Sequence, residues 1–330
     1  MAPSSSMPSP APADAAVPRV VVDAHHHLWD LSAGRYPWLQ EGYDEQAFFL
    51  GDHRALQQNF LPADYRRVSA GCGVVATVHV EAERDRGEQV AETDWLHQQH
   101  AAHGLPSVVV AHAWLDRPET AERLLQHLQY PLVRGIRSKP VTAPGPHTSV
   151  RGQPGTLQDE RWLRGLALLQ QHGLSWDLRV PAWHLAEAAE VAAMFPQLRI
   201  VLNHHGFAWD RSAAGLRLWR EGMERLAQQP NVCVKLSEFG LRDQPWDEAD
   251  NTRIAHETLR LFGWQRCLFA SNFPVAGLRI GYAELVAALW RMLAHLPPEQ
   301  QHAVMAGNAL RVYRIPLPNE TSPPWTPTNT

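Results

Sequence analysis

A pair of histidines near the start of the chain has the residue type and spacing for chemistry. Residues 20–22 are Val-Val-Val, and His25, His26 and His27 follow after two further positions. A short β-branched run is typical of a buried strand. Side chains alternate along an extended chain, so His25 and His27 would project to the same side. Two imidazoles aimed at one point could hold a metal ion or polarise a substrate oxygen. A solvated or core-packed pair explains the motif alone equally well, so the rest of the chain must decide.

Eight short apolar segments could position such residues. They predict strands at 20–22, 73–81, 107–114, 132–137, 174–180, 198–203, 232–236 and 267–270. Helical patterns cover 62–69, 87–102, 118–128, 157–172, 183–194, 216–228, 252–262, 282–293 and 299–312. Strands that alternate with helices predict an α/β fold, and this number of repeats predicts a (β/α)8 TIM barrel.

Polar residues gather at the ends of these predicted strands. In a (β/α)8 barrel the active site lies at the C-terminal ends of the strands. The residues that could meet there are His25, His27, Glu81, His112, Arg137, Asp177, His204, Lys235, Glu238 and Asn272. Any one of them could be a buried, paired structural group. Their shared position is therefore what indicates a site.

Composition excludes several classes of partner. The 330 residues include 30 basic and 34 acidic side chains, a net charge of −4 without long blocks of like charge. This pattern indicates neither nucleic acid nor an anionic membrane as a partner, and we expect a small-molecule substrate. Cys72, Cys233 and Cys267 are widely spaced and odd in number, so neither a disulfide framework nor a C-x-x-C zinc site is indicated.

The two ends of the chain differ from its middle. Residues 1–18 are rich in Ala, Pro and Ser and lack the basic start and apolar run of a secretory signal, so we expect a disordered arm. The barrel would occupy 19–315, and a Pro-rich tail would follow at 316–330. No apolar stretch reaches the length of a membrane span, and we expect a cytoplasmic protein.

Two long connections could shape a pocket at the strand ends. The first, 28–60, carries the aromatic residues Trp29, Tyr36, Trp38, Tyr43, Phe48 and Phe49. Its aromatic content argues against disorder, and it is expected to form a wall or lid, or to cover one end of the core. The second, 140–155, is rich in Pro and Gly and is expected to be a loop near the same pocket.

Several motifs, in their order along the chain, carry a family resemblance. They are DAHHHLWD at 23–30 with YPWL at 36–39, HVEA at 79–82, VRGIR at 133–137, VLNHHG at 201–206, VKLSEFG at 234–240, FASNFPV at 269–275 and GNALRVYRI at 307–315. With them the chain resembles the amidohydrolase superfamily, in its branch of sugar-lactone and dicarboxylate-lactone hydrolases. The resemblance spans 20–315 and implies an amidohydrolase-like TIM barrel.

The resemblance implies roles for individual residues. The family's H-x-H falls on His25 and His27, and its later histidine falls on His204. These three would polarise the carbonyl of a lactone or related carboxylic ester, directly or through one bound divalent ion such as zinc; both possibilities stay open. Arg137, with Lys139 or Lys235 as secondary candidates, would bind a substrate carboxylate or hydroxyl.

One position departs from the family pattern. The aspartate that follows the eighth strand in the family is Asn272 here, and an amide cannot take up a proton at neutral pH. The base must therefore lie elsewhere, and Asp177, Glu238 and Glu81 are candidates by position. Asp177 and Glu238 are also predicted to contact substrate. Each of these carboxylates could instead pair with a neighbouring cation.

Two other functions remain compatible with the sequence. Decarboxylation or carbon–carbon bond hydrolysis occurs in other branches of the superfamily, and product analysis would separate it from lactone opening. The second possibility is not an enzyme but a barrel that has lost catalysis and only binds a ligand. Asn272, in place of the family's aspartate, is the residue that is compatible with this possibility.

Overall fold

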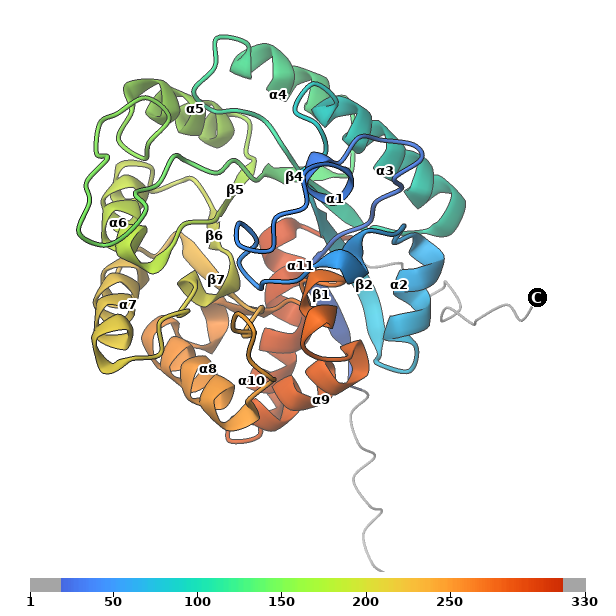
Figure 1. Ribbon diagram of the computed structural model, residues 1–330, viewed down its shortest axis with the longest axis vertical. Coiled ribbons are helices and arrows are strands. Elements are labelled where there is room, and N and C mark those ends of the chain that lie inside the picture. Colours follow the sequence, from blue (N-terminus) through green and yellow to red (C-terminus); the bar gives the residue numbers. More distant parts are fainter. Residues whose placement is uncertain (1–18, 317–330) are drawn as a thin grey trace, which may run out of the picture.

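Eight parallel strands form the centre of the computed structural model, which describes residues 19–316 (Figure 1). They are β1 (Val21–His26), β2 (Val74–Val80), β3 (Val108–Ala111), β4 (Val133–Ile136), β5 (Ser175–Leu178), β6 (Ile200–Leu202), β7 (Val232–Leu236) and β8 (Cys267–Phe269). Their order in the sheet is their order in the chain. The predicted TIM barrel is confirmed. The expected arm at 1–18 and nearly all of the expected tail lie outside the described residues.

Helices surround the strands (Figure 1). They are α1 (Pro37–Gln40), α2 (Pro62–Ser69), α3 (Gln89–His103), α4 (Thr120–Leu128), α5 (Glu160–Gln171), α6 (Leu185–Met194), α7 (Ala213–Ala227), α8 (Glu248–Phe262), α9 (Tyr282–Met292), α10 (Pro298–His302) and α11 (Asn308–Tyr313). Within 19–316 none of them combines the length and apolarity that crossing a bilayer requires.

Among the helices that differ from their predicted bounds, three do so for clear local reasons. The prediction of a single helix at 299–312 is wrong, because a π-helical turn at Ala303–Gly307 separates α10 from α11. α7 and α8 begin earlier than predicted. The Ser212 side chain accepts a hydrogen bond from the Gly215 amide (3.1 Å), and Asp247 caps α8 in the same way. These caps satisfy amides that the first turn leaves without partners.

The barrel closes where β1 meets the segment after β8. The amide of His27 donates to the carbonyl of Phe273 (2.8 Å), and the amide of Asn272 donates to the carbonyl of His25 (2.7 Å). These bonds stand in place of a longer β1–β8 ladder. They hold the first histidine motif and the segment around Asn272 side by side, although more than 240 positions separate them in the sequence.

A bulge in β1 turns His25 into the barrel. Positions 23 and 26 of β1 pair with positions 77 and 79 of β2, so three steps on one strand match two on the other. Ala24 already belongs to the apolar cluster inside the barrel, whereas Asp23 bonds to Tyr65 on the outer helix α2 (2.8 Å). Regular alternation would send His25 outward after Ala24. The extra residue lets both His25 and His27 point to the mouth.

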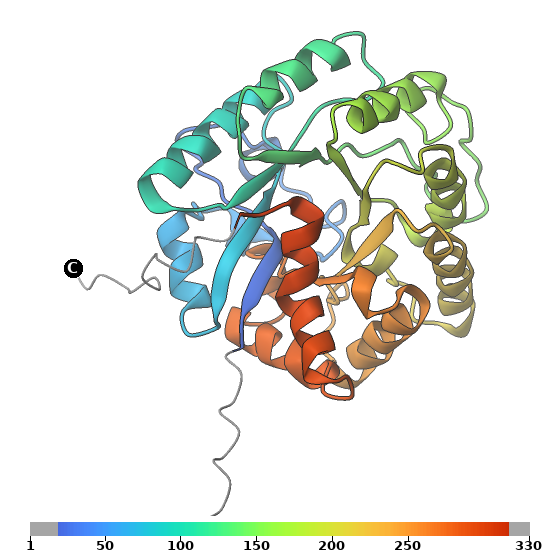
Figure 2. The same ribbon diagram turned by 180° about the vertical axis from the view of Figure 1, so that it is seen from behind.

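The interior of the barrel is packed with small and branched side chains, and α11 covers its other end (Figure 2). Valine, alanine and leucine residues from five strands and Cys233 from β7 form this cluster together with α11 residues, among them Tyr313. The Tyr313 hydroxyl donates to Asp177 on β5 (2.9 Å), and Asp177 also forms an ion pair with Lys235 on β7 (2.5 Å). Both charged side chains are 0% exposed. A polar column therefore runs along the barrel axis beneath the mouth.

A glycine of α5 tests how tightly the helices pack on the barrel. A Cβ at Gly165 would lie 2.3 Å from the backbone oxygen of Leu115, which cannot move away as a side chain could. We expect Gly165→Ala to lower the free energy of unfolding by about 1–3 kcal/mol, because overpacking outweighs the roughly 1 kcal/mol of added helix propensity. Urea unfolding measures this change in the free energy of unfolding. Gly145→Ala, where nothing lies within 4 Å, is the control and should stay within about 0.5 kcal/mol. A stabilised Gly165→Ala variant would contradict this packing.

Candidate active site

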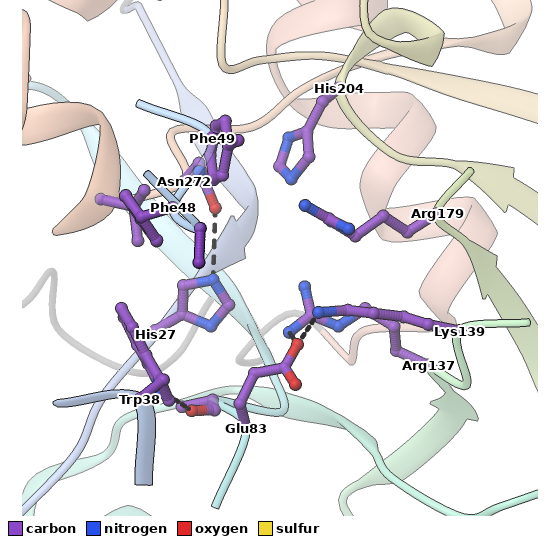
Figure 3. Close-up of a pocket in the computed structure, with 13 residues that line it drawn as sticks. His27, Trp38, Phe48, Phe49, Glu83, Arg137, Lys139, Arg179, His204 and Asn272 are labelled. Atoms are coloured by element: carbon purple, nitrogen blue, oxygen red, sulfur yellow. Dashed lines mark hydrogen bonds and ion pairs between the residues drawn. The ribbon is translucent and has the colours of Figure 1, made fainter. Parts of the chain in front are cut away.

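A cavity of about 220 Å³ opens at the C-terminal ends of the strands (Figure 3). Its lining residues are His27, Trp38, Ala47, Phe48, Phe49, Ala82, Glu83, Arg137, Lys139, Arg179, His204, Asn272 and Val275. The predicted wall is confirmed, since Trp38, Phe48 and Phe49 come from the connection after β1. The loop at 140–155, by contrast, contributes no lining residue.

His25 lies just beneath this cavity with a defined proton position. Lys235 Nζ lies 3.2 Å from His25 Nδ1, and an ammonium can only donate, so Nδ1 is the acceptor. Burial lowers the pKa of His25 well below its ordinary value, and the charge of Lys235 adds to this effect. The neutral ring therefore carries its proton on Nε2. That atom lies 3.3 Å from His27 Nε2.

His27 is oriented by the backbone. Its Nδ1 lies 2.7 Å from the carbonyl oxygen of Val80, which can only accept, so Nδ1 carries the proton. Burial, and then the charge of Arg137, lower the pKa of His27 well below its ordinary value. The neutral ring keeps a lone pair on Nε2, and the Nε2–H of His25 lies 3.3 Å away, where it can donate to it. Asn272 Oδ1 lies 3.2 Å from this atom and accepts a hydrogen bond from it only when His27 also carries a proton on Nε2.

Asn272 connects His27 to a buried carboxylate. Its Nδ2 donates to Glu238 Oε2 at 2.5 Å, and within residues 19–316 the other oxygen of Glu238 has no hydrogen-bond partner. Burial raises the pKa of Glu238 to about 7, against the lowering effect of the Asn272 hydrogen bond. Glu238 does not itself line the cavity. It lies behind Asn272 and reaches the site only through that amide.

His204 completes the histidine group from the other side of the barrel. Its ring centroid lies 4.7 Å from that of His25, and its Nδ1 lies 2.8 Å from Ser237 Oγ. Burial lowers the pKa of His204 well below its ordinary value, followed by the charges of Arg179 and Lys235. The ring points into the cavity in Figure 3. The structure thus brings His25, His27, His204 and Asn272 together, as expected.

Backbone strain is concentrated at the same place. His204, Glu238 and Asn272 have φ values of 54°, 51° and 54°. Non-glycine residues rarely adopt this left-handed conformation, and it costs on the order of 1–3 kcal/mol unless local hydrogen bonds offset it. The three strand ends that carry these residues are therefore held in unusual geometry where they face the cavity.

The four predicted substrate contacts have different positions. Arg137 lines the cavity but is committed to Glu81, with Nε 2.6 Å from Oε1. Although burial opposes it, Arg137 holds the pKa of Glu81 well below its ordinary value. Asp177 and Lys235 do not line the cavity and bond to each other beneath it. Glu238, as described, lies behind Asn272, so direct substrate contact by these last three is not supported.

The sequence analysis missed several residues of the site. Arg179 and Glu83 line the cavity, and Lys139, considered only as a weaker candidate, pairs there with Glu83. Desolvation and the neighbouring charge of Arg179 lower the pKa of Lys139 to about 7. The signal for Arg179 was its position two residues after Asp177, directly after the end of β5.

The donor atoms match a metal ion only in part. Two nitrogens bound to one tetrahedral zinc at about 2.1 Å lie about 3.4 Å apart, and His25 Nε2 and His27 Nε2 are 3.3 Å apart. However, residues 19–316 contain no group of three His, Cys, Asp or Glu side chains placed to hold a metal. Asn272 offers a weaker amide oxygen, and the Lys235 ammonium contacts His25. The residues present do not fit a tightly held zinc ion.

The family assignment rests on a comparison along almost the whole barrel. Residues 22–315 match the model of a family described as amidohydrolase. The chain belongs to the amidohydrolase family. The resemblance read from the motifs is thereby confirmed, and the protein is a hydrolase.

Relatives and solved structures agree with this assignment. An uncharacterised protein y4mH of Sinorhizobium fredii is 32% identical over 295 residues, which cover 89% of this chain and 98% of that protein. A protein of Burkholderia multivorans named L-fucono-1,5-lactonase is 27% identical over 320 residues, 90% of this chain and 97% of that protein. Among solved structures, an amidohydrolase from Burkholderia multivorans with bound zinc superposes with a TM-score of 0.74 at 24% identity. It covers 90% of this chain and 100% of that one. This last likeness shows the fold.

The buried histidines make the fold sensitive to acid. Burial lowers the pKa of His26 and His205 to about 3 and of His127 to about 4. Unfolded histidine titrates near pH 6.5, so below that pH the unfolded chain binds protons that the native chain does not. Stability should fall as pH decreases from 6.5, by about 2 kcal/mol for each of the two former residues at pH 5.

Thermal unfolding between pH 7.5 and pH 5 measures this effect. Burial raises the pKa of Glu92 and of Glu238 to about 7, and these two groups act in the opposite sense, stabilising the native chain as pH falls from 7 towards 4.5. The histidines outnumber them, so we expect a lower Tm at pH 5. An equal or higher Tm there would contradict the neutral state assigned to the histidines.

Proposed function

We propose that the protein opens a lactone or a related carboxylic ester by attack of water on the carbonyl carbon. The observation that carries this proposal is the convergence of His27, His204 and Asn272 on one cavity, with neutral imidazoles on both sides of the position for a carbonyl group. The relative named L-fucono-1,5-lactonase supports the reaction type.

His204 is proposed to polarise the carbonyl. If the Ser237 hydroxyl donates to Nδ1, the neutral ring carries its proton on Nε2, which points into the cavity. An N–H group held in a water-poor site stabilises the oxyanion that forms when water attacks, because it needs no reorganisation during the reaction.

His27 is proposed to take the proton of the attacking water. For this step the water takes the place of the His25 N–H as the donor to the Nε2 lone pair, and the new N–H would donate to Asn272 Oδ1 at 3.2 Å. Since Asn272 Nδ2 donates to Glu238, the imidazolium would be stabilised by a carboxylate acting through an amide. Water oxygen bonds to the carbonyl carbon, the ring C–O bond breaks, and the proton passes to the leaving oxygen.

Of the three candidate carboxylates, Glu238 is the one that this proposal uses. Asp177 is bonded to Lys235 and Tyr313, and Glu81 is bonded to Arg137 and Arg86, so neither has a role left at the cavity. Glu238 contacts the cavity-lining Asn272, and alone of the three it has an oxygen without a hydrogen-bond partner within 19–316. Glu238 is accordingly a positioning residue that supports His27.

Removing the His204 ring tests the proposed polarising group. We expect His204→Ala to lower kcat for lactone opening by about 100- to 1,000-fold, since a lost oxyanion donor costs this much in other hydrolases. Acid release from a panel of lactones, followed with a pH indicator, measures it. His147→Ala, at an exposed position, is the control and should keep full activity. A His204→Ala variant that keeps its Tm and its activity would refute the site.

A charge swap tests the support of His27. Glu238→Gln keeps the shape but removes the charge, and we expect kcat to fall about 10-fold or more with little change in KM. In the double variant Glu238→Gln/Asn272→Asp, a carboxylate at position 272 accepts directly from His27, so part of the lost kcat should return. Unchanged kcat in Glu238→Gln would contradict the role. A double variant no faster than Glu238→Gln would contradict it too.

A further inference from the structure

A second hollow lies beside the cavity at the strand ends. It has a volume of about 670 Å³, and segments that follow β6 and β7 form most of its wall together with the start of α8. Phe49, Trp209, Arg211, Arg242 and Asp250 are among its lining residues. We call it the outer cavity, and the cavity of the candidate active site the inner cavity. Phe49 lines both, so the two are neighbours.

One aromatic side chain stands between the two cavities. The ring centroid of Phe49 lies 5.7 Å from Cζ of Arg179 in the inner cavity and 5.7 Å from the ring centroid of Trp209 in the outer cavity. Figure 3 shows the Phe49 ring at the upper end of the inner cavity. Phe49 belongs to the long connection after β1 rather than to a strand, and it is only partly buried. A change of its rotamer would therefore join the two cavities without movement of the barrel.

The outer cavity contains hydrogen-bond donors that the protein does not use. Within residues 19–316, Nε1 of Trp209 and Nε of Arg211 are buried and have no hydrogen-bond partner. A buried indole N–H usually has an acceptor, and leaving such a donor without one costs free energy. The charge of Arg211 is already balanced by Asp250, whose Oδ2 lies 3.2 Å from Nη1. The unused N–H groups therefore match a neutral acceptor such as a hydroxyl group.

The charges that line the outer cavity cancel. Arg211 and Arg242 are the basic residues of its wall, and Asp247 and Asp250 are the acidic ones. An anion would meet the two carboxylates, and a cation would meet the two guanidinium groups. A wholly apolar molecule would cover polar groups and cost their desolvation. A neutral ring with several hydroxyls can donate to the carboxylates and accept from the unused N–H groups, while its C–H bonds pack against Trp209.

The sizes of the two cavities indicate a substrate with two rings. The inner cavity, at about 220 Å³, is below the roughly 300–1,000 Å³ of drug-sized ligand pockets and has room for one ring. The outer cavity lies within that range. A molecule whose reacting ring lies at the histidines and whose second ring lies beyond Phe49 would occupy both.

We propose that the outer cavity binds a neutral sugar ring, and that the substrate is an aldobionolactone, a sugar lactone that carries this second sugar through a glycosidic bond. The lactone part of this inference rests on the proposed function. The sugar part rests on the outer cavity alone. Nε1 of Trp209 and Nε of Arg211 donate to hydroxyls of the second ring, and Asp250 accepts from a hydroxyl of the same ring.

Unreactive ligands test the outer cavity without any reaction. A 1,5-lactam keeps the ring and the carbonyl of a lactone but resists hydrolysis. Isothermal titration calorimetry compares gluconolactam, which has one ring, with cellobionolactam and maltobionolactam, which carry a second glucose through a β and an α linkage. We expect at least one two-ring lactam to bind about 10-fold or more tightly than gluconolactam. Equal or weaker binding of both two-ring lactams, or no binding by any of the three, would overturn the sugar site.

Two variants locate this preference in the outer cavity. Trp209→Phe keeps an aromatic ring but removes the unused N–H, so the ratio of two-ring to one-ring affinity should fall about 5-fold. Gln244→Trp places a large side chain at an exposed position of the outer cavity's wall and should abolish the preference. Trp95→Phe is the matched control, because Trp95 lies on α3 and lines neither cavity, and it should keep the wild-type ratio. If both outer-cavity variants keep their Tm and the wild-type ratio, the second ring binds elsewhere and the proposal is wrong.

Kinetics separate the sugar site from the reaction. Acid release is followed with glucono-1,5-lactone, cellobiono-1,5-lactone and maltobiono-1,5-lactone. The lactone that corresponds to the preferred lactam should have a KM about 10-fold or more below that of glucono-1,5-lactone, with a smaller change in kcat. If no lactone is opened but the two-ring preference of the lactams holds, the proposed function fails and the sugar site stands. If all three lactones are opened with equal KM and the lactams bind equally, the sugar site fails and the proposed function stands.

Discussion

The ion pair of Lys235 and Asp177 inside the barrel is the interaction on which the site depends. Taking both charges out of water is costly, and the pair is tolerable only because Tyr313, Asn203 and His25 satisfy the remaining hydrogen bonds. Removing one partner would leave a buried charge, which costs roughly 3–5 kcal/mol. The same pair directs an ammonium at His25 Nδ1, and so determines which nitrogen of that ring carries its proton.

The positions of the side chains at the barrel mouth depend on this buried ion pair and on two features of the backbone. The bulge in β1 turns His25 toward Lys235, and the backbone bonds that close the barrel place Asn272 beside His27. The family's aspartate is absent at 272, but a carboxylate has not left the site. Glu238 supplies this carboxylate behind Asn272, and the Asn272 amide lies between it and His27. Left-handed backbone at both 238 and 272 shows that the two strand ends are bent to make this contact.

The barrel and the meeting of its histidines could be predicted from the sequence. Strand periodicity and the position of polar residues at strand ends are local signals, and in a (β/α)8 barrel the C-terminal strand ends all lie at the same face. It could not predict pairing across the barrel. Asp177 and Lys235 are 58 positions apart, and nothing in the sequence distinguishes a paired lysine from one that faces substrate. For the same reason the sequence could not show that Arg137 is already paired with Glu81. Nor could it show that Arg179 lines the cavity. Helix starts were missed where Ser212 and Asp247 supply caps.

The site histidines are neutral, with tautomers set by Lys235 and by the Val80 carbonyl, so that His27 keeps an unprotonated Nε2 beside the cavity. Long-range ¹H–¹⁵N NMR of protein labelled with ¹⁵N-histidine measures this directly. At pH 7 the account predicts a neutral His25 protonated on Nε2 and a neutral His27 protonated on Nδ1. An imidazolium at either position, or a His27 ring that carries its proton on Nε2, would contradict it.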